Sequence, residues 1–383
     1  MLKANTPQLN EVELNMDTQN GSNLFSDAHT KFSLELFQRG LASCKNENVL
    51  VSPLSAALAL ALAAGGAKGE TLAGMEQALG GLPLRDLQSA LSDWKNALPE
   101  SEECRLKTAD SVWIREGLRV REVFLKQSGA EIFTAPFDDS TVREINAWCS
   151  RNTDGMIPEI LRTLSPDLRL CIINAVLFDA KWEVLYKDDD IQTEQFTDFR
   201  GRQQETKMMF SHENSYLSDG RAEGFLKHYR GHSYAFAALL PEEGLSAAEY
   251  AMSLTPQRLR HILETRRYAD VRAGIPVFQT DFSAELKPIL AEMGMTQAFA
   301  QNADFSGITE EPLKIDSILQ KTHIEIDPKG TRAAAVTAML AAAGCAMPID
   351  RKYVILNRPF VYMILDAERN LPFFIGILNT RED

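Results

Sequence analysis

The sequence predicts a single compact domain that contains both helices and strands, from about residue 25 to the C-terminus. The chain has 383 residues, enough to bury a large core, and neither a linker nor a repeat divides it. Residues 54–64 are almost entirely apolar, which predicts a buried helix. Residues 324–327 read Ile-Glu-Ile-Asp, and this alternation is typical of a half-buried strand.

The N-terminal segment, residues 1–24, is rich in Asn, Gln, Glu and Thr, so we expect a disordered lead-in. No charged region followed by an apolar run marks a secretory signal in this segment. The apolar helix at 54–64 would span only about 17 Å, too short to cross a membrane. We therefore expect it to be a core helix.

The net charge argues against several kinds of binding partner, and the cysteine content argues against disulfide and zinc sites. Forty Lys and Arg against 53 Asp and Glu give a net charge of −13, which repels nucleic acid and anionic membrane surfaces. The five cysteines are odd in number and far apart, so neither a disulfide framework nor a zinc motif fits: Cys44, Cys104, Cys149, Cys171 and Cys345. For Cys345 a small apolar role is the first interpretation, and a redox role is the alternative.

Signatures of catalysis and of cofactor binding are not found. The sequence contains no G-x-S-x-G, H-E-x-x-H or G-x-G-x-x-G motif. Residues 65–71 superficially resemble a phosphate loop, but Lys68 precedes Gly69, and Glu70 would face the phosphate. His228 and His232 have helical metal-ligand spacing, yet the Tyr-Arg-Gly between them favours a turn. We expect no enzyme activity, no cofactor and no metal.

The most informative segment comprises residues 330–347. It consists mostly of small residues, is almost uncharged and lies close to the C-terminus. Three interpretations are possible: a buried helix, an aggregation-prone low-complexity loop, or a segment that can be inserted into a sheet as a strand. Its Ala, Met and Leu favour a helix. The alternating strand that runs directly into it favours the third interpretation, with Gly330 as a hinge and Thr331 as the first inserted residue. One face of that strand would then be uniformly small, formed by Thr331, Ala333, Ala335, Thr337 and Met339.

Motifs spread along the chain support this interpretation. They lie at residues 48–55, 66–71, 145–157, 174–178, 181–183, 207–209, 275–278, 293–295, 303–308, 357–360 and 373–376. In this order they resemble the conserved blocks of the serpin family along almost the whole chain. The chain resembles an inhibitory, bacterial-type member of this family.

The resemblance implies an α+β fold: one serpin domain over residues 25–383, with about nine helices around three β-sheets and an exposed reactive-centre loop at about 328–350. It also implies a serine protease partner and a monomer. The protease would cut the loop and be trapped as a covalent acyl-enzyme while the loop inserts into the central sheet. About fifteen residues at about 3.3 Å each make a strand of about 50 Å. The native state would be metastable.

Two groups of site residues follow from the resemblance. The hinge would comprise Gly330, Thr331, Arg332, Ala333, Ala334, Ala335, Val336 and Thr337. The shutter and entry region, where the sheet opens, would comprise Ser52, Pro53, Ser55, Asn174, Trp182 and Gln320. The alternative is that Ser52, Asn174 and Gln320 are satisfied core groups and Trp182 a large core residue.

Three positions depart from the family pattern. Pro328 stands where an acidic residue usually pairs with a base, so insertion could be slower or less complete, and we expect the proline where the chain leaves the sheet. Arg332 replaces a usually acidic residue but should face outward. Gln320 aligns with a His of many animal members and does not titrate.

The scissile bond is predicted within residues 340–347. Counting from Gly330 gives Gly344–Cys345, whereas the spacing from residues 357–360 points near Pro348. The alternatives are Leu340, Ala341, Ala342, Ala343, Ala346 and Met347. No Lys, Arg or aromatic residue lies between Arg332 and Arg351, which favours elastase-like or subtilisin-like proteases over trypsin-like ones.

Two other functions remain open. Pro328 and the uncertain loop length are compatible with a serpin-fold binder or chaperone that does not inhibit. An unrelated intracellular protein could also use the Ala-rich segment as a partner helix. Family habit favours extracellular action, and the missing signal leaves the cytoplasm open.

Overall fold

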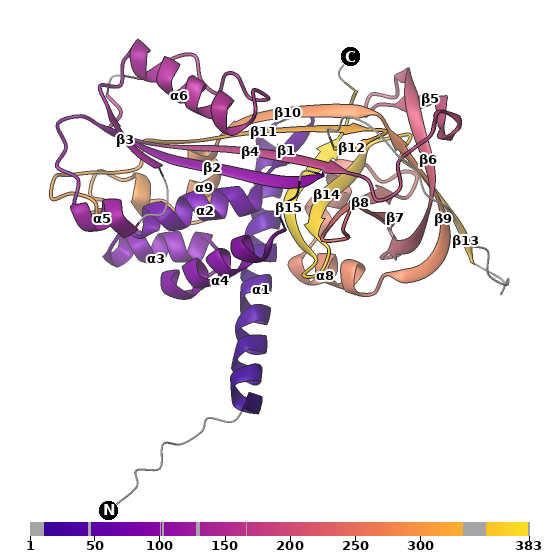
Figure 1. Cartoon of the computed structure of the whole chain (residues 1–383), viewed down its shortest axis with the longest axis horizontal. Helices are drawn as coiled ribbons and strands as arrows, with labels where there is room; N and C mark the ends of the chain where they lie inside the picture. The colour runs from indigo at the N-terminus through magenta and orange to yellow at the C-terminus, as the bar shows by residue number, and fades with distance from the viewer. Residues whose placement is uncertain are drawn as a thin grey trace, which may run out of the picture.

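The computed structural model describes residues 11–44, 47–99, 101, 103–127, 131–165, 167–331 and 350–381. A six-stranded sheet forms the centre of the molecule (Figure 1). The helix α6 (Asp139–Asn152) lies over one face of this sheet. The helices α2 (Pro53–Ala64), α3 (Gly69–Ala78) and α4 (Leu84–Ala97) lie on the opposite side, and a second, larger sheet packs at one end.

The predicted apolar helix is confirmed as α2. Pro53 occupies its first turn, where a missing N–H costs nothing, and Ser52 precedes it in an extended conformation. Almost every side chain of α2 is buried, because the helix lies between the six-stranded sheet and other helices. The remaining α-helices are α1 (Glu11–Ser43), α5 (Glu122–Gln127), α7 (Ala247–Ser253), α8 (Pro256–Glu264) and α9 (Leu286–Glu292). Two short 3₁₀-helices, Asp188–Asp190 and Gln297–Phe299, complete the helices of the described residues.

The start of α1 differs from the expected lead-in. The helix begins at Glu11, so residues 11–24 are helical where the composition predicts disorder, and this end of α1 projects from the body of the molecule (Figure 1). The later part of α1 is held by buried residues such as Phe32 and Phe37. Because extending an existing helix costs far less than starting one, this anchored part carries the helix into a polar segment. Residues 1–10 lie outside the described part of the chain.

The strands form two hydrogen-bonded sheets in the described residues, whereas the resemblance implies three. The six-stranded sheet has the order β10 (Phe278–Glu285), β11 (Ser317–Asp327), β12 (Gly330–Thr331), β4 (Leu170–Lys181), β2 (Cys104–Arg115) and β3 (Glu131–Ala135). The larger sheet has the order β1 (Val49–Val51), β15 (Leu371–Leu378), β14 (Phe360–Asp366), β8 (Tyr234–Pro241), β7 (Ala222–His228), β6 (Gln203–Ser218), β9 (Arg267–Pro276) and β13 (Arg351–Ile355), with β5 (Ile191–Thr197) paired to β6.

The long strand β6 explains this difference in number. Its first part pairs with β5, its last four residues pair with β7, and β9 pairs along most of its length. A register shift between Glu213 and Ser215 lets one strand bend between two groups of strands. Two sheets of the expected fold are therefore joined into one ladder, and the α+β architecture is unchanged.

The strand β11 confirms the predicted alternation at residues 324–327. Ile324 and Ile326 are buried, whereas Glu325 and Asp327 are partly exposed. Most buried apolar residues lie in one cluster between the two sheets and the helices. A smaller cluster, which includes Trp113 and Trp148, fills the space between α6 and the outer face of the six-stranded sheet. Among the described helices, none is both long and apolar enough to span a membrane.

Candidate functional site: the seam between β11 and β4

The six-stranded sheet is partly open along the line between β11 and β4, which we call the seam. Seven residue pairs, from Ser317↔Cys171 to His323↔Leu177, join the two strands directly in parallel. Beyond them the strands diverge, and β12 lies between them, antiparallel to both. The chain therefore turns back after β11 and places two residues, Gly330 and Thr331, in the open end of its own sheet.

A tight turn after β11 directs the chain into the seam. Asp327 Oδ1 accepts hydrogen bonds from the backbone N–H of Lys329 at 2.7 Å and of Gly330 at 3.0 Å. Burial raises the pKa of the Asp327 carboxyl above its usual range. Pro328 lies in this turn, outside the β11 ladder, as expected for a residue that lacks an N–H.

Gly330 is required by its surroundings. Its φ of +149° is unfavourable for other residues, and a Cβ added there would lie 2.1 Å from the carbonyl oxygen of Ala180. Gly330 pairs with Lys181 of β4 on one side and with Asp327 of β11 on the other. A side chain at this position would push the turn out of the seam.

Thr331 is fully buried at the entrance of the seam. Its hydroxyl lies 2.7 Å from the hydroxyl of Tyr229, and the ring of Tyr229 stacks on Trp182 with 4.4 Å between ring centroids. The indole N–H of Trp182 donates to the carbonyl of Asp327 at 2.9 Å. Trp182 is thus both a buried aromatic residue and a direct support of the turn, so the two interpretations of this residue are compatible.

A buried polar circuit closes the seam farther along. The side chain of Gln320 accepts from Ser52 N at 3.1 Å, donates to Ser52 O at 3.0 Å and donates to Asn174 Oδ1 at 2.7 Å. The amide of Asn174 donates to Ser55 Oγ. The circuit connects β11, β4 and α2, because Gln320 and Asn174 stand opposite each other in the ladder. Pro53, the remaining predicted residue of this region, is buried at the start of α2 and takes no part in the polar circuit.

The sequence interpretation did not include Asp110, which the structure adds to this circuit. It lies on β2 opposite Asn174, whose amide also donates to Asp110 Oδ1. Burial raises the pKa of the Asp110 carboxyl to about 7. Period-2 alternation could have found it, because Asp110 shares a face with Leu106 and Val112, both of which are buried.

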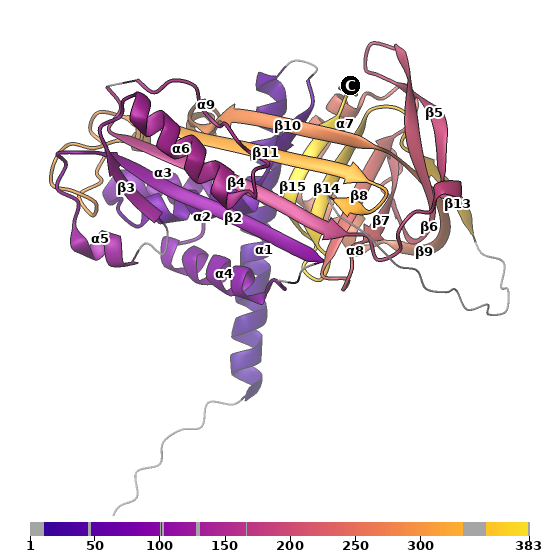
Figure 2. The same ribbon diagram turned by 45° about the horizontal axis from the view of Figure 1, so that its top comes forward.

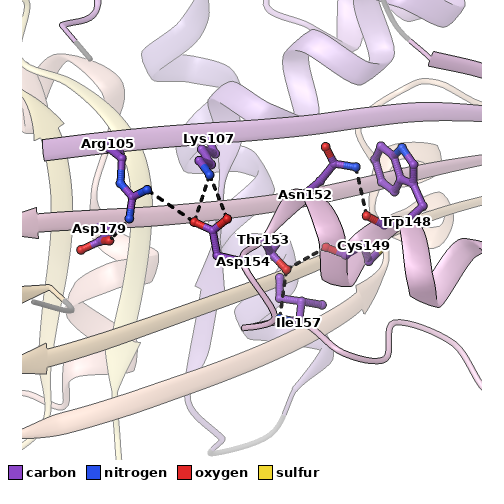
Figure 3. A network of polar contacts seen from close by, with 9 residues as sticks. All are labelled: Arg105, Lys107, Trp148, Cys149, Asn152, Thr153, Asp154, Ile157 and Asp179. Carbon is purple, nitrogen blue, oxygen red and sulfur yellow. Dashed lines mark hydrogen bonds and ion pairs between the residues drawn. The ribbon is translucent and has the colours of Figure 1, made fainter. Parts of the chain in front are cut away.

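An ionic cluster fastens the end of α6 to the outer face of the sheet (Figure 3). Asp154, directly after the helix, contacts Lys107 Nζ at 2.9 Å and Arg105 at 3.6 Å, both on β2. Arg105 also reaches Asp179 of β4 at 2.5 Å. The hydroxyl of Thr153 donates to the carbonyl of Cys149 at 2.8 Å and fixes the preceding turn.

The segment after α6 continues across the seam. Lys321 of β11 donates from Nζ to the carbonyl of Glu159 at 2.6 Å. Figure 2 shows α6 extended across the outer face of the sheet. The helix and the segment that follows it therefore contact strands on both sides of the seam.

Other predicted groups show no further chemistry within the described residues. His228 and His232 flank the predicted turn, and no group of three metal-ligating side chains is found there. Cys104, Cys149 and Cys171 are buried free thiols, and burial raises the pKa of each to about 12. Arg332, Ala333, Ala334, Ala335, Val336, Thr337, Cys345 and every candidate residue of the scissile bond lie outside the described residues.

Comparison with known proteins gives the family. The model of the family described as "Serpin (serine protease inhibitor)" matches residues 27–380. The chain belongs to the serpin family. Members of this family are generally serine protease inhibitors rather than enzymes.

Curated relatives and solved structures cover nearly the whole of this serpin. An uncharacterized serpin-like protein of Thermococcus kodakarensis is 30% identical over 371 residues, 93% of this chain and 86% of the relative. Alpha-1-antiproteinase 2 of Equus caballus is 30% identical and aligns over 90% of this chain and 84% of its own. The thermophilic serpin tengpin in its native state has 37% identity and a TM-score of 0.87, with 98% of this chain and 96% of the other covered. The latent state of tengpin gives a TM-score of 0.81 at 34% identity, covering 98% of this chain and 100% of the other.

Proposed function

We propose that this serpin inhibits serine proteases as a suicide substrate, with the loop after Thr331 as bait and the seam as its destination. The observation that carries the proposal is β12, which already lies between β11 and β4 at the end where insertion must begin. Cleavage of the loop would free the chain after β12, and extension of this strand along the seam would carry the acyl-bound protease with it.

The register of β12 predicts the path of insertion. Gly330 pairs with Lys181 and Thr331 with Ala180, so an antiparallel extension would bring residue 341 opposite Leu170, at the far end of β4. The 12 residues of β4 span about 40 Å. The protease would therefore move along the full length of the sheet before its acyl bond could be hydrolysed.

The same register gives a role to Arg332. The next residue of the extended strand would lie opposite Asp179 on β4 and opposite Glu325 on β11. Asp179 belongs to the outer face, where Arg105 contacts it. An arginine at position 332 would thus meet an acid on each side, which favours insertion at a place where most family members carry an acid.

Insertion must also break existing contacts. The seven pairs between β11 and β4 and the bond between Gln320 and Asn174 would be lost, and a new strand would be paired on both sides. Each backbone hydrogen bond contributes about 1 kcal/mol net. The gain exceeds the loss because one ladder is replaced by two.

We also propose that the targets are elastase-like or subtilisin-like and that the complex is covalent, as the small apolar residues between 333 and 347 favour. The test is to incubate the protein with pancreatic elastase and with subtilisin, using trypsin as the mismatched control. A complex that survives denaturing electrophoresis, and a cleaved product with a strongly raised melting temperature, are expected. Cleavage without a complex and without a melting shift would contradict inhibition and favour the non-inhibitory binder.

A further inference from the structure

Asp110 is an acid on the inner face of the six-stranded sheet. Alternate residues of β2 point toward α2, and on this face Asp110 follows Cys104, Leu106 and Thr108 and precedes Val112. Cys104, Leu106 and Val112 are buried, and Asp110 itself is half-buried. A carboxyl at this place is uncommon, because a charge here loses part of its contact with water.

The groups around this carboxyl provide limited compensation for a charge. Asn174 of β4 and Ser55 of α2 both hydrogen-bond to it. Helix α2 carries no ionisable side chain. The cation that favours the ionised form of the Asp110 carboxyl is Lys95 of α4. On β2 the nearest titratable group of the same face is the thiol of Cys104, which is neutral at ordinary pH. The two hydrogen bonds and the lysine only partly offset the loss of hydration, so the protonated form is favoured up to about pH 7, the pKa of the carboxyl.

The carboxyl is one side chain away from the seam. Asn174 connects Asp110 to Gln320, and the bond between Asn174 and Gln320 crosses from β4 to β11. When the seam opens, β4 moves away from β11 and the polar circuit parts. Water that enters the gap can then hydrate the carboxyl, which lowers the free energy of its ionised form more than that of its protonated form.

We propose that the protonation state of Asp110 controls how fast the seam opens: the protonated carboxyl keeps β4 and β11 together, and the ionised carboxyl promotes their separation. This inference rests on the proposed function, because it concerns the opening that loop insertion needs. Because Asp110 lies on β2, this strand would control the rate of the loop insertion that starts from β12.

The direction of the pH effect follows from linkage. The closed seam binds the proton more tightly than the open one, so deprotonation favours opening as the pH rises toward 7. Above the pKa of the closed state the effect saturates. Opening should therefore slow by about three- to tenfold for each pH unit from 7 down to 5, the upper value applying if the open state restores an ordinary aspartate.

The experiment measures opening without any protease. A fluorescent synthetic peptide with the sequence of residues 331–342 is mixed with the intact protein between pH 5 and pH 8.5, and its incorporation rate is followed by native electrophoresis. The variant Asp110→Asn retains the shape of the side chain and cannot ionise. The matched control is Asp93→Asn, which removes an exposed carboxyl from α4.

The wild type and Asp93→Asn should show the predicted slowing below pH 7, whereas Asp110→Asn should incorporate the peptide at one slow rate throughout. A pH profile that Asp110→Asn does not change would overturn the inference and point to another carboxyl, such as that of Asp327. Incorporation by the wild type at a rate independent of pH would overturn it too but leave the proposed function standing. Failure of every protein to take up peptide at any pH would refute seam opening itself, and this inference with it.

A second measurement verifies that Asp110→Asn is folded. Urea unfolding at pH 5 and at pH 8 should show that the wild type loses stability through Asp110 as the pH rises, and that the variant lacks this component. The same pH difference in both proteins would overturn the inference independently of the peptide.

Discussion

Replacing Thr331 by arginine tests the proposed start of insertion. Thr331 is fully buried between Ile326 of β11 and Ala180 of β4, and its hydroxyl contacts Tyr229. None of these three neighbours can neutralise a guanidinium. Thr331→Arg would therefore have to bury an unpaired charge or leave the seam. An unpaired buried charge costs about 3 kcal/mol or more, which would slow insertion by about 100-fold.

The slower insertion should convert the inhibitor into a substrate. The scissile bond is predicted within residues 340–347, away from Thr331, so acylation by elastase should be unaffected, and the acyl-enzyme would be hydrolysed before the strand is inserted. The assay is the number of inhibitor molecules cleaved per protease molecule trapped, measured by titration and by denaturing electrophoresis. Thr331→Val is the matched control, since it retains the shape and loses only the bond to Tyr229, worth about 1 kcal/mol, or a fivefold slowing. Unchanged trapping by Thr331→Arg would refute the assigned entry point.

Two further predictions follow from the described contacts of Gly330 and His29, and a third follows from the register proposed for Arg332. Gly330→Ala should slow complex formation at least tenfold, because its Cβ would meet the oxygen of Ala180 at 2.1 Å, and an unaltered rate would contradict the close approach. Arg332→Glu should slow complex formation with the protease about three- to tenfold, because the proposed register places the new glutamate between two acids. The effect should be smaller in 0.5 M salt, and a faster reaction would exclude the predicted register. Burial lowers the pKa of His29 to about 4, so the unfolded chain takes up a proton at this residue below pH 6.5, and the contribution of His29 to folding stability should fall by about 2 kcal/mol between pH 7 and pH 5. Urea unfolding should show this contribution as a difference between the wild type and His29→Gln, which should shift by about 2 kcal/mol against the wild type from pH 7 to pH 5. The opposing contribution of Asp110 is present in both proteins and cancels in this difference. His29→Gln retains a donor for the carbonyl of Pro372.

Local patterns in the sequence predicted the elements that depend on local physics. The apolar run at 54–64 could only be a buried helix, and the alternation at 324–327 could only place Ile324 and Ile326 inside. The glycine at position 330 marked the place where the chain needs an unusual φ. Each of these features depends on a few consecutive residues, which is why the sequence contains the information.

Features that depend on distant contacts were not predictable in this way. The polar circuit joins Ser52, Asn174 and Gln320, which are more than a hundred residues apart in sequence, and only the family resemblance suggested that they meet. The register shift in β6 that merges two sheets has no local signal. Asp110 was missed because an acid in a strand is normally taken to face solvent, and only its buried neighbours of the same face show otherwise.

The seam separates two tasks along its length. At the entrance, Gly330 and Thr331 determine where insertion begins, and they act through shape and packing, which do not respond to pH. Farther along, Gln320 holds β11 with three hydrogen bonds of about 1 kcal/mol each, one to Asn174 of β4 across the seam and two to the backbone of Ser52 before α2. Glutamine does not titrate, so this position gives the lock a constant strength where a histidine would not. Any pH response of the circuit must then arise from its carboxyl member, Asp110, on the next strand. The two ends can therefore be altered independently: substitutions at the entrance should change the yield of trapped protease at every pH, and Asp110→Asn should change only how the rate depends on pH.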